Sequence, residues 1–160
     1  MMVKFICKSK EETQELGKLL AKESFVREVI TLKGQLGAGK TTFSQGFANG
    51  LGIKGIINSP TFNIVKCYFD SIIPLYHIDA YRLEDGTNKD IGLEEFIDGD
   101  GLCVIEWPNF IDYLIPNLYL SINIEHVDGD IRKFKISSKD ERWNSLIDSL
   151  KEEFLCTESF

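Results

Sequence analysis

The alternation of apolar and polar positions predicts a chain in which strands and helices are intermixed. The segment VKFICKS, residues 3–9, alternates like a short strand, and the apolar run LCVIEW, residues 102–107, is typical of a strand buried on both faces. Two later segments flank a turn at Asp128–Gly129 and predict an antiparallel pair. The members of this pair cover residues 118–127 and 131–138. The other predicted strands cover residues 26–34, 63–69 and 74–82.

Helical periodicity separates these strands. Ser9 and Glu12 have the spacing of a capping box, and Leu16, Leu19 and Leu20 then share one face of the helix that follows. Further helices are predicted before the glycines at 50 and 52, within residues 90–101 and over residues 140–154. The pattern predicts a three-layer α/β fold with a mixed parallel and antiparallel sheet. No repeat or linker marks a boundary, so residues 1–160 are expected to form a single domain.

Composition narrows the function classes. The chain has 160 residues, is 43% hydrophobic and 27% charged, and carries a net charge of −7, so an autonomous nucleic-acid binder is not expected. The first residues do not resemble a signal peptide, and no apolar run approaches the roughly 20 residues of a membrane span. The four cysteines lie far apart and form no CxxC pair, which disfavours a zinc or disulfide framework. A cytoplasmic location is therefore expected.

A candidate phosphate-binding loop lies at GQLGAGKT, residues 34–41. It fits GxxxxGK(S/T), follows a predicted strand and opens a predicted helix, although a glycine-rich turn can also simply join a strand to a helix. Glycines let successive N–H groups face one concavity, Lys40 can reach the β- and γ-phosphates, and the Thr41 hydroxyl can ligate Mg²⁺. The residues expected to bind the nucleotide here are Gly37, Ala38, Gly39, Lys40, Thr41 and Thr42.

The second half of such a site is predicted at Glu106, the last residue of the buried run 102–106. Open α/β sheets bind ligands at the carboxyl ends of their strands, where a carboxylate can hold Mg²⁺ or orient a hydrolytic water. The alternative is a surface glutamate at a strand end.

Other phosphate chemistries fit the sequence less well. TNKD at residues 87–90 misses the guanine-binding NKxD pattern by one place, and DxxG at residues 98–101 precedes a strand instead of following one. The same DGDG lacks the later glutamate of a calcium loop. The chain has only four arginines, which disfavours a small-molecule kinase with an arginine-rich lid.

Four motifs, GQLGAGKTTF, SPTF, HIDAYRL and VIEW, occur in this order between about Ile30 and Pro116. With their spacing, the chain resembles the bacterial TsaE (YjeE) ATPases of tRNA threonylcarbamoyladenosine biosynthesis. The resemblance implies a P-loop NTPase-like fold, ATP and Mg²⁺ as cofactors, and the proteins TsaD and TsaB as partners, with tRNA held through those partners. It also implies that ATP hydrolysis supports that machinery and is not the carbamoyl transfer itself. Gln35 stands where the family commonly has aspartate.

Roles for the remaining residues follow from the same motifs. Thr61 in SPTF is a candidate γ-phosphate sensor, with a plain Ser-Pro turn as the alternative. In LYHIDAYR, the strand period predicts His77, Asp79 and Tyr81 on one face. The resemblance makes Asp79 a catalytic or metal-positioning carboxylate, and a His-x-Asp transition-metal pair is disfavoured. His77 is expected either to orient Asp79, to touch phosphate, or to be an ordinary strand histidine.

The expected catalytic residues are Lys40, Asp79 and Glu106, and the expected Mg²⁺ ligands are Thr41, Asp79 and Glu106. Trp107 is expected either to cover the site or to lie in the core, and Tyr81 and Arg82 to support the sheet edge or a partner surface. Two other functions remain open at this point. One is a nucleotide-dependent binding switch in which hydrolysis is incidental, and the other is a small-molecule kinase.

Overall fold

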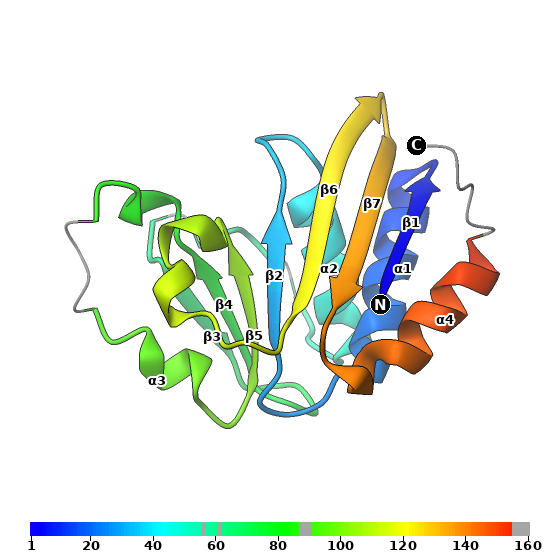
Figure 1. Ribbon diagram of the computed structural model, residues 1–160. Coiled ribbons are helices and arrows are strands. Elements are labelled where there is room, and N and C mark those ends of the chain that lie inside the picture. Colours follow the sequence, from blue (N-terminus) through cyan, green and yellow to red (C-terminus); the bar gives the residue numbers. More distant parts are fainter. Residues whose placement is uncertain (56, 61, 87–90, 155–160) are drawn as a thin grey trace.

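The computed structural model describes residues 1–55, 57–60, 62–86 and 91–154. Its centre is a seven-stranded sheet with the order β1-β7-β6-β2-β5-β4-β3 (Figure 1). Strands β6, β2, β5 and β4 run parallel, and the pairs β1–β7, β6–β7 and β3–β4 are antiparallel, which confirms the predicted mixed sheet. The strands are β1 (Met2–Cys7), β2 (Val29–Lys33), β3 (Val65–Tyr68), β4 (Leu75–Asp79), β5 (Leu102–Glu106), β6 (Leu120–Asp128) and β7 (Ile131–Ser138).

Helices cover one face of the sheet completely and the other only in part. The helices are α1 (Lys10–Glu23), α2 (Lys40–Gly50), α3 (Glu94–Ile97) and α4 (Asn144–Glu153), with 3₁₀ turns η1 (Tyr81–Leu83), η2 (Pro108–Phe110), η3 (Asp112–Leu114) and η4 (Glu141–Trp143). Among the described residues, no helix is both long enough and apolar enough to cross a membrane. Half of the predicted capping box forms at α1, where the Ser9 hydroxyl accepts a hydrogen bond from the Glu12 amide at 3.2 Å, while the Glu12 carboxylate accepts from the Lys8 amide at 2.6 Å.

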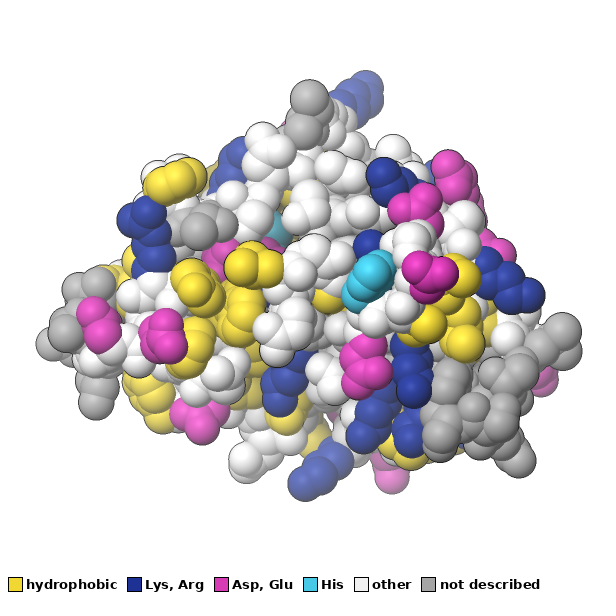
Figure 2. All heavy atoms as spheres, turned by 90° about the horizontal axis from the view of Figure 1, so that it is seen from above, with side chains coloured by type: hydrophobic (Ala, Val, Ile, Leu, Met, Phe, Trp, Pro, Cys, Tyr) yellow, Lys and Arg dark blue, Asp and Glu magenta, His cyan; other side chains and the backbone are white. Residues whose placement is uncertain are grey.

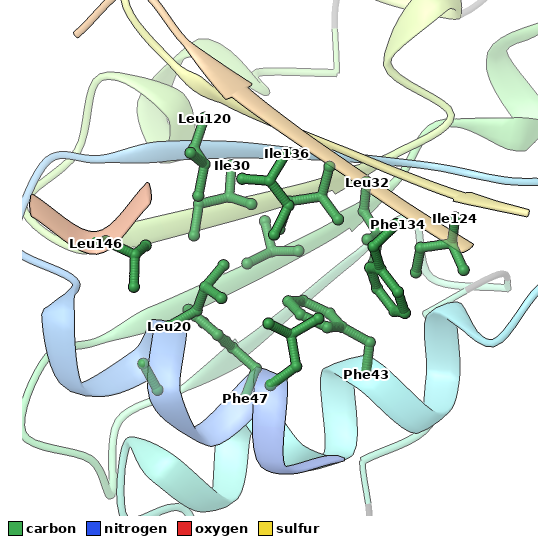
Figure 3. Packing of buried hydrophobic residues seen from close by; sticks show 14 of the residues in the cluster. Leu20, Ile30, Leu32, Phe43, Phe47, Leu120, Ile124, Phe134, Ile136 and Leu146 are labelled. Atoms are coloured by element: carbon green, nitrogen blue, oxygen red, sulfur yellow. The ribbon is translucent and has the colours of Figure 1, made fainter. Parts of the chain in front are cut away.

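The larger core lies between the sheet and helices α1, α2 and α4 (Figure 3). Aromatic and aliphatic side chains from the helices meet one face of β2, β6 and β7, and burying each removes it from water at a gain of about 1.5–3 kcal/mol. The residues labelled there are Leu20, Ile30, Leu32, Phe43, Phe47, Leu120, Ile124, Phe134, Ile136 and Leu146. Close helix packing holds α2 in place, because a Cβ at Gly46 would lie 2.1 Å from the Gln14 carbonyl oxygen of α1.

A second, smaller core lies on the opposite face, over β4, β5 and the start of β2 only. It contains Ile78 and Ile105 from the strands and is covered by Leu93, Ile97 and Ile111 from α3 and the turns. The corresponding face of β6, β7 and β1 carries partly or fully exposed polar side chains instead. One half of this sheet face is therefore packed and the other half is open to solvent.

Three cysteines among the described residues are free thiols. Cys7 and Cys103 are buried and Cys67 is partly buried, and Cys156 lies outside the described residues. Burial raises the pKa of Cys7 to about 12 and raises that of Cys103 further still. The two buried thiols therefore stay protonated and pack as small apolar side chains.

Helix α4 is joined to the sheet through a buried carboxylate at Glu28. Glu28 is 1% exposed and accepts hydrogen bonds from the Trp143 indole Nε1 at 3.0 Å and from the Arg142 guanidinium at 3.1 Å. Burial raises the pKa of Glu28 from 4.5 to about 7, although both donors oppose the shift. Nearby Asp140 has a lowered pKa, chiefly because Arg142 donates to it, and stays ionised in this range.

The raised pKa of Glu28 predicts a pH-dependent stability. Between pH 4.5 and about 7 the folded protein binds a proton that the unfolded chain has lost, so the contribution of Glu28 is complete below 4.5 and is lost as the pH rises through 7. We expect the free energy of unfolding to fall with rising pH across this window, and Glu28→Gln to remove that slope. Urea unfolding, monitored by tryptophan fluorescence across this pH window, measures the slope of the free energy of unfolding against pH. The exposed variant Glu141→Gln is the control. An unchanged slope in Glu28→Gln would contradict the prediction.

Candidate nucleotide site

The candidate site lies where the carboxyl ends of β2, β4 and β5 meet the first turn of α2. The chain leaves β2 at Gly34 and turns through Gly37 and Gly39, whose positive φ angles of 78° and 109° suit glycine. At Gly34 the approach is close, because a Cβ there would lie 2.9 Å from the Ile124 carbonyl oxygen. The predicted glycine-rich loop thus forms between a strand and a helix, with the helix N-terminus behind it.

Lys40 is the first residue of α2 and is 7% exposed. Its ammonium donates a hydrogen bond to the Gly34 carbonyl at 2.7 Å and lies 4.2 Å from the centre of the Trp107 ring. Burial lowers the pKa of Lys40 below its ordinary value, while the nearby Glu106 and Asp79 carboxylates act in the opposite direction. Within the described part of the chain, Lys40 is therefore a buried cation with a single hydrogen bond to the loop, placed close to two acids.

Asp79 and Glu106 form a pair of buried carboxylates. They end adjacent strands β4 and β5 and lie opposite each other in the register, with exposures of 4% and 3%. The Ser59 hydroxyl lies 2.8 Å from Asp79 Oδ2 and 3.3 Å from Glu106 Oε2, so one side chain bridges the two acids. Two buried acids this close need a cation to offset their repulsion.

His77 contacts Glu106 and not Asp79. Its Nε2 atom lies 2.8 Å from Glu106 Oε2, and both side chains are buried. An ionised carboxylate only accepts hydrogen bonds, so beside ionised Glu106 the Nε2 atom carries the proton. The expectation that His77 orients Asp79 is wrong, because adjacent strands bring His77 to the neighbouring acid instead.

The strand predicted over residues 74–82 ends earlier, at Asp79. The Asp79 carboxylate accepts a hydrogen bond from the Tyr81 amide at 3.0 Å, and the Ala80 amide donates to the Glu106 carbonyl at 3.0 Å. An aspartate that bonds the backbone two residues ahead favours a turn. Tyr81 therefore does not share a strand face with Asp79, and it begins the η1 turn beside the site.

Trp107 occupies a strained position directly after Glu106. Its φ angle of 55° is left-handed, which costs a non-glycine residue about 1–3 kcal/mol. The ring packs against Tyr81, with centroids 5.0 Å apart, and against Phe110 at 6.1 Å. Trp107 combines features of both expectations, since its partly buried ring lies 4.2 Å from the Lys40 ammonium and lines the pocket, and it also packs against the smaller core.

These side chains line a pocket of about 350 Å³. Of the predicted residues it brings together Gly37, Gly39, Lys40, Thr41, Thr42, Asp79 and Glu106. Ala38 does not line it, because its side chain is buried in the larger core and its amide donates to the Gln35 carbonyl at 3.0 Å. Gln35 itself is exposed outside this pocket. Thr61 lies outside the described residues.

Three lining residues were not predicted from the sequence, namely Leu36 of the glycine-rich loop, Ser59 and Arg132. Ser59 belongs to the same SPTF motif as Thr61, so the motif marked the segment but not the residue. Arg132 comes from the β6–β7 hairpin, and its guanidinium donates to the Gly37 carbonyl at 3.3 Å. No sequence pattern predicts that Arg132 lines the pocket, because its position depends on how the hairpin packs across the loop. Its buried Nε atom has no partner among the described residues.

A parallel-centred α/β sheet, with a glycine-rich strand-to-helix loop and acids on two neighbouring strands, defines the P-loop NTPase-like class. Within it, the chain matches the family model of the threonylcarbamoyl adenosine biosynthesis protein TsaE over residues 7–134. It is 45% identical over 140 residues to the tRNA threonylcarbamoyladenosine biosynthesis protein TsaE of Bacillus subtilis, covering 88% of each chain. The protein of that name from Nostoc is 39% identical over 140 residues, covering 85% of this chain and 86% of the relative.

A solved structure agrees with these matches. The crystal structure of Bacillus subtilis YdiB is similar with a TM-score of 0.80 and 37% identity, covering 95% of each chain. The chain therefore belongs to the TsaE family.

Proposed function

We propose that this protein is a Mg²⁺-dependent ATPase of tRNA threonylcarbamoyladenosine biosynthesis, and that it works with the partner proteins TsaD and TsaB. Membership of the TsaE family supports the pathway. The observation that carries the ATPase proposal is the arrangement of Lys40, Asp79 and Glu106 around one pocket at the end of the phosphate-type loop. Such loops bind nucleotide phosphates through backbone N–H groups, a lysine and a helix N-terminus.

The oxygen donors in the pocket fit Mg²⁺. This ion prefers oxygen ligands, is usually held by one or two carboxylates with substrate phosphates, and keeps several waters. Asp79 and Glu106 supply two buried carboxylates, and the Thr41 hydroxyl lines the same pocket. Within the described residues no group of three or more His, Cys, Asp and Glu side chains is placed to hold a metal, so phosphate oxygens would complete the set. When bound, Mg²⁺ would neutralise charge on the phosphates.

The chain's own residues would bind and orient the nucleotide. Lys40 would exchange its bond to the Gly34 carbonyl for phosphate oxygens, where a buried ammonium attracts more strongly than in water. Glu106, held through Oε2 by His77 and Ser59, has Oε1 to present to a water or to the metal. Arg132, beside the loop at Gly37, would add a cation next to the nucleotide, and Trp107 would limit access of water.

Phosphate release tests this function against its alternatives. We expect slow release from ATP by the protein alone and faster release when TsaD and TsaB are added together. ATP binding without phosphate release, even with both partners, would indicate the nucleotide-dependent switch. Transfer of the labelled γ-phosphate to a compound in a metabolite panel would indicate a kinase. Either result would overturn the proposed hydrolysis.

His77 offers a test of how Glu106 is held. In His77→Ala the carboxylate keeps only the 3.3 Å contact to Ser59, so its orientation is lost while the loop stays intact. We expect the rate of hydrolysis to fall about tenfold or more with a nearly unchanged ATP affinity, and the fold to lose about 1–3 kcal/mol. Single-turnover hydrolysis and equilibrium ATP binding measure the two effects separately. Exposed His126→Ala is the control, and equal loss of binding and rate in His77→Ala would contradict this role.

A further inference from the structure

The open half of the sheet face carries two rows of side chains that run across four strands, and all of them are polar except Met2 on β1. In the register, Thr31 of β2 lies beside Ser121 of β6, which lies beside Ser137 of β7. Two residues further along each strand, the next row is Lys33, Asn123, Lys135 and, on β1, Lys4. Because side chains alternate along a strand, both rows point away from the core that packs on α1 and α2.

Three adjoining hollows follow this face, with volumes of about 450, 350 and 440 Å³. The first and second share Asn117, Tyr119 and Lys139, and the second and third share Lys33, Pro108 and Asn109. Together they form one continuous trough, which runs from the first two residues of the chain to Gly34 and Gln35 behind the phosphate-type loop. Its far wall is the η2–η3 segment. The trough adjoins the pocket that holds Asp79 and Glu106, and of the described residues Trp107 alone lines both.

Thr31 lies on the floor of this trough with an unsatisfied hydroxyl. The residue is 1% exposed, and its Oγ1 atom has no hydrogen-bond partner among the described residues. A buried hydroxyl without a partner costs about 1–3 kcal/mol. A valine of nearly the same shape would avoid that cost, so the hydroxyl indicates a ligand that reaches the middle hollow, between Lys33 and Lys139.

The sheet face along the trough is also locally basic, with Lys4 and Lys135 beside the lining residues Lys33 and Lys139, although the chain carries a net charge of −7. Lys4 lies directly opposite Lys135, and like charges facing each other across a strand pair are destabilising. In the described part of the chain, Lys4, Lys33, Lys135 and Lys139 form no ion pair with a carboxylate. Figure 2 shows Lys and Arg side chains gathered below the centre of the view, toward the side on which β6 and β7 lie in front of α2 in Figure 1. Two carboxylates line the trough in the described part of the chain, Asp112 in the middle hollow and Glu125 in the third.

We infer that this trough binds the phosphodiester backbone of RNA. Its chemistry is that of phosphate contacts, which come from lysine and from Ser, Thr and Asn side chains. An acidic protein partner fits less well, because protein interfaces are depleted of lysine and are anchored by buried aromatic and apolar side chains. Of the described aromatic residues, Tyr119 lines the first two hollows and Trp107 lines the third. The interaction is weak for the isolated chain, since its net negative charge repels a polyanion.

This inference goes beyond the proposed function and does not depend on it, because the lysines that carry it line the trough and not the nucleotide pocket. Its test therefore uses the full chain without nucleotide. Binding of a labelled RNA hairpin is followed by fluorescence anisotropy at low salt and then over a salt series. The trough variant is Lys33→Ala with Lys139→Ala, and the matched control is Lys22→Ala with Lys54→Ala, two exposed lysines outside the trough that give the same change in charge.

We expect the wild type and the control pair to bind the hairpin with similar affinity, and the trough pair to bind about tenfold or more weakly. The slope of log affinity against log salt should fall by about 1 for each phosphate contact removed. Thr31→Val should also weaken RNA binding while its unfolding midpoint stays the same or rises. Circular dichroism checks that all variants remain folded.

Three outcomes would overturn the inference. One is the absence of RNA binding by the wild type at low salt, and another is an equal loss in the trough and control pairs. The third is displacement of the RNA by an acidic peptide at comparable concentration, which would assign the trough to an acidic protein partner.

Discussion

Lys40→Ala is expected to weaken ATP binding by about 10- to 100-fold, since a hydrogen bond to a charged group contributes about 1.5–3 kcal/mol and each 1.4 kcal/mol is a factor of ten. The ammonium is buried, lies at the first turn of α2 and makes a single hydrogen bond to the loop, to Gly34. It is thus placed to bind phosphate, and its removal also leaves Asp79 and Glu106 without their nearest buried cation. Calorimetric titration with ATP and Mg²⁺ measures the effect.

Exposed Lys54→Ala is the matched control for Lys40→Ala, because it removes the same charge from the loop beyond α2. Its ATP affinity should equal that of the wild type. Thermal unfolding of both variants separates lost binding from lost structure. A folded Lys40→Ala protein that binds ATP as tightly as the control would show that the loop does not bind phosphate through this lysine.

Glu106→Gln and Asp79→Asn are expected to retain ATP binding and lose hydrolysis. Each amide keeps the size of its carboxylate but cannot act as a base and is a weak ligand for Mg²⁺. The rate should fall about 10²–10⁴-fold in Glu106→Gln, the usual contribution of a positioned acid or base. The effect of Asp79→Asn is expected to be smaller, since the Tyr81 amide and Ser59 tie that carboxyl into the turn.

Exposed Glu95→Gln on α3 is the control for both carboxylate variants, as it removes one acid far from the pocket. Multiple-turnover phosphate release in the presence of TsaD and TsaB gives the rates, and ATP titration gives the affinities. Wild-type hydrolysis by both Glu106→Gln and Asp79→Asn would refute the assignment of these acids.

Local sequence patterns predicted much of the fold because each pattern depends on near neighbours. The continuous apolar run before Glu106 requires burial on both faces, and β5 is indeed a central parallel strand. Ser9 and Glu12 specify the start of α1 through a hydrogen bond between residues only three positions apart. Strand ends were less accurate, because they depend on contacts from other segments. Tyr81 lies outside the strand that the sequence predicted, because its amide donates a hydrogen bond to the Asp79 side chain and the strand ends there.

The site was predictable where a motif lies within one stretch of chain and less so where separate strands meet. Lys40, Asp79 and Glu106 lie on motifs and line one pocket. The partner of His77 depends on the β4–β5 register, which the sequence does not reveal. Arg132 reaches the loop from a hairpin nearly a hundred residues away, 95 positions after Gly37.

The lysine-lined trough illustrates the same limit. Lys4, Lys33 and Lys135 are isolated charges in the sequence and form a row only when β1, β7, β6 and β2 are in register. Net charge alone argued against autonomous nucleic-acid binding by this chain, because it averages over both faces of the sheet. The distribution of the charges is visible only in the fold.

The dependence of ATP affinity on Mg²⁺ tests most directly whether the loop and the two acids form one Mg²⁺-ATP site. Titrations with ATP are made with and without Mg²⁺ for the wild type and for the double variant Asp79→Asn with Glu106→Gln. In the wild type Mg²⁺ should tighten ATP binding, and in the double variant most of that gain should disappear while binding without Mg²⁺ is kept. An equal gain in both proteins would show that Asp79 and Glu106 do not hold the metal beside the phosphates.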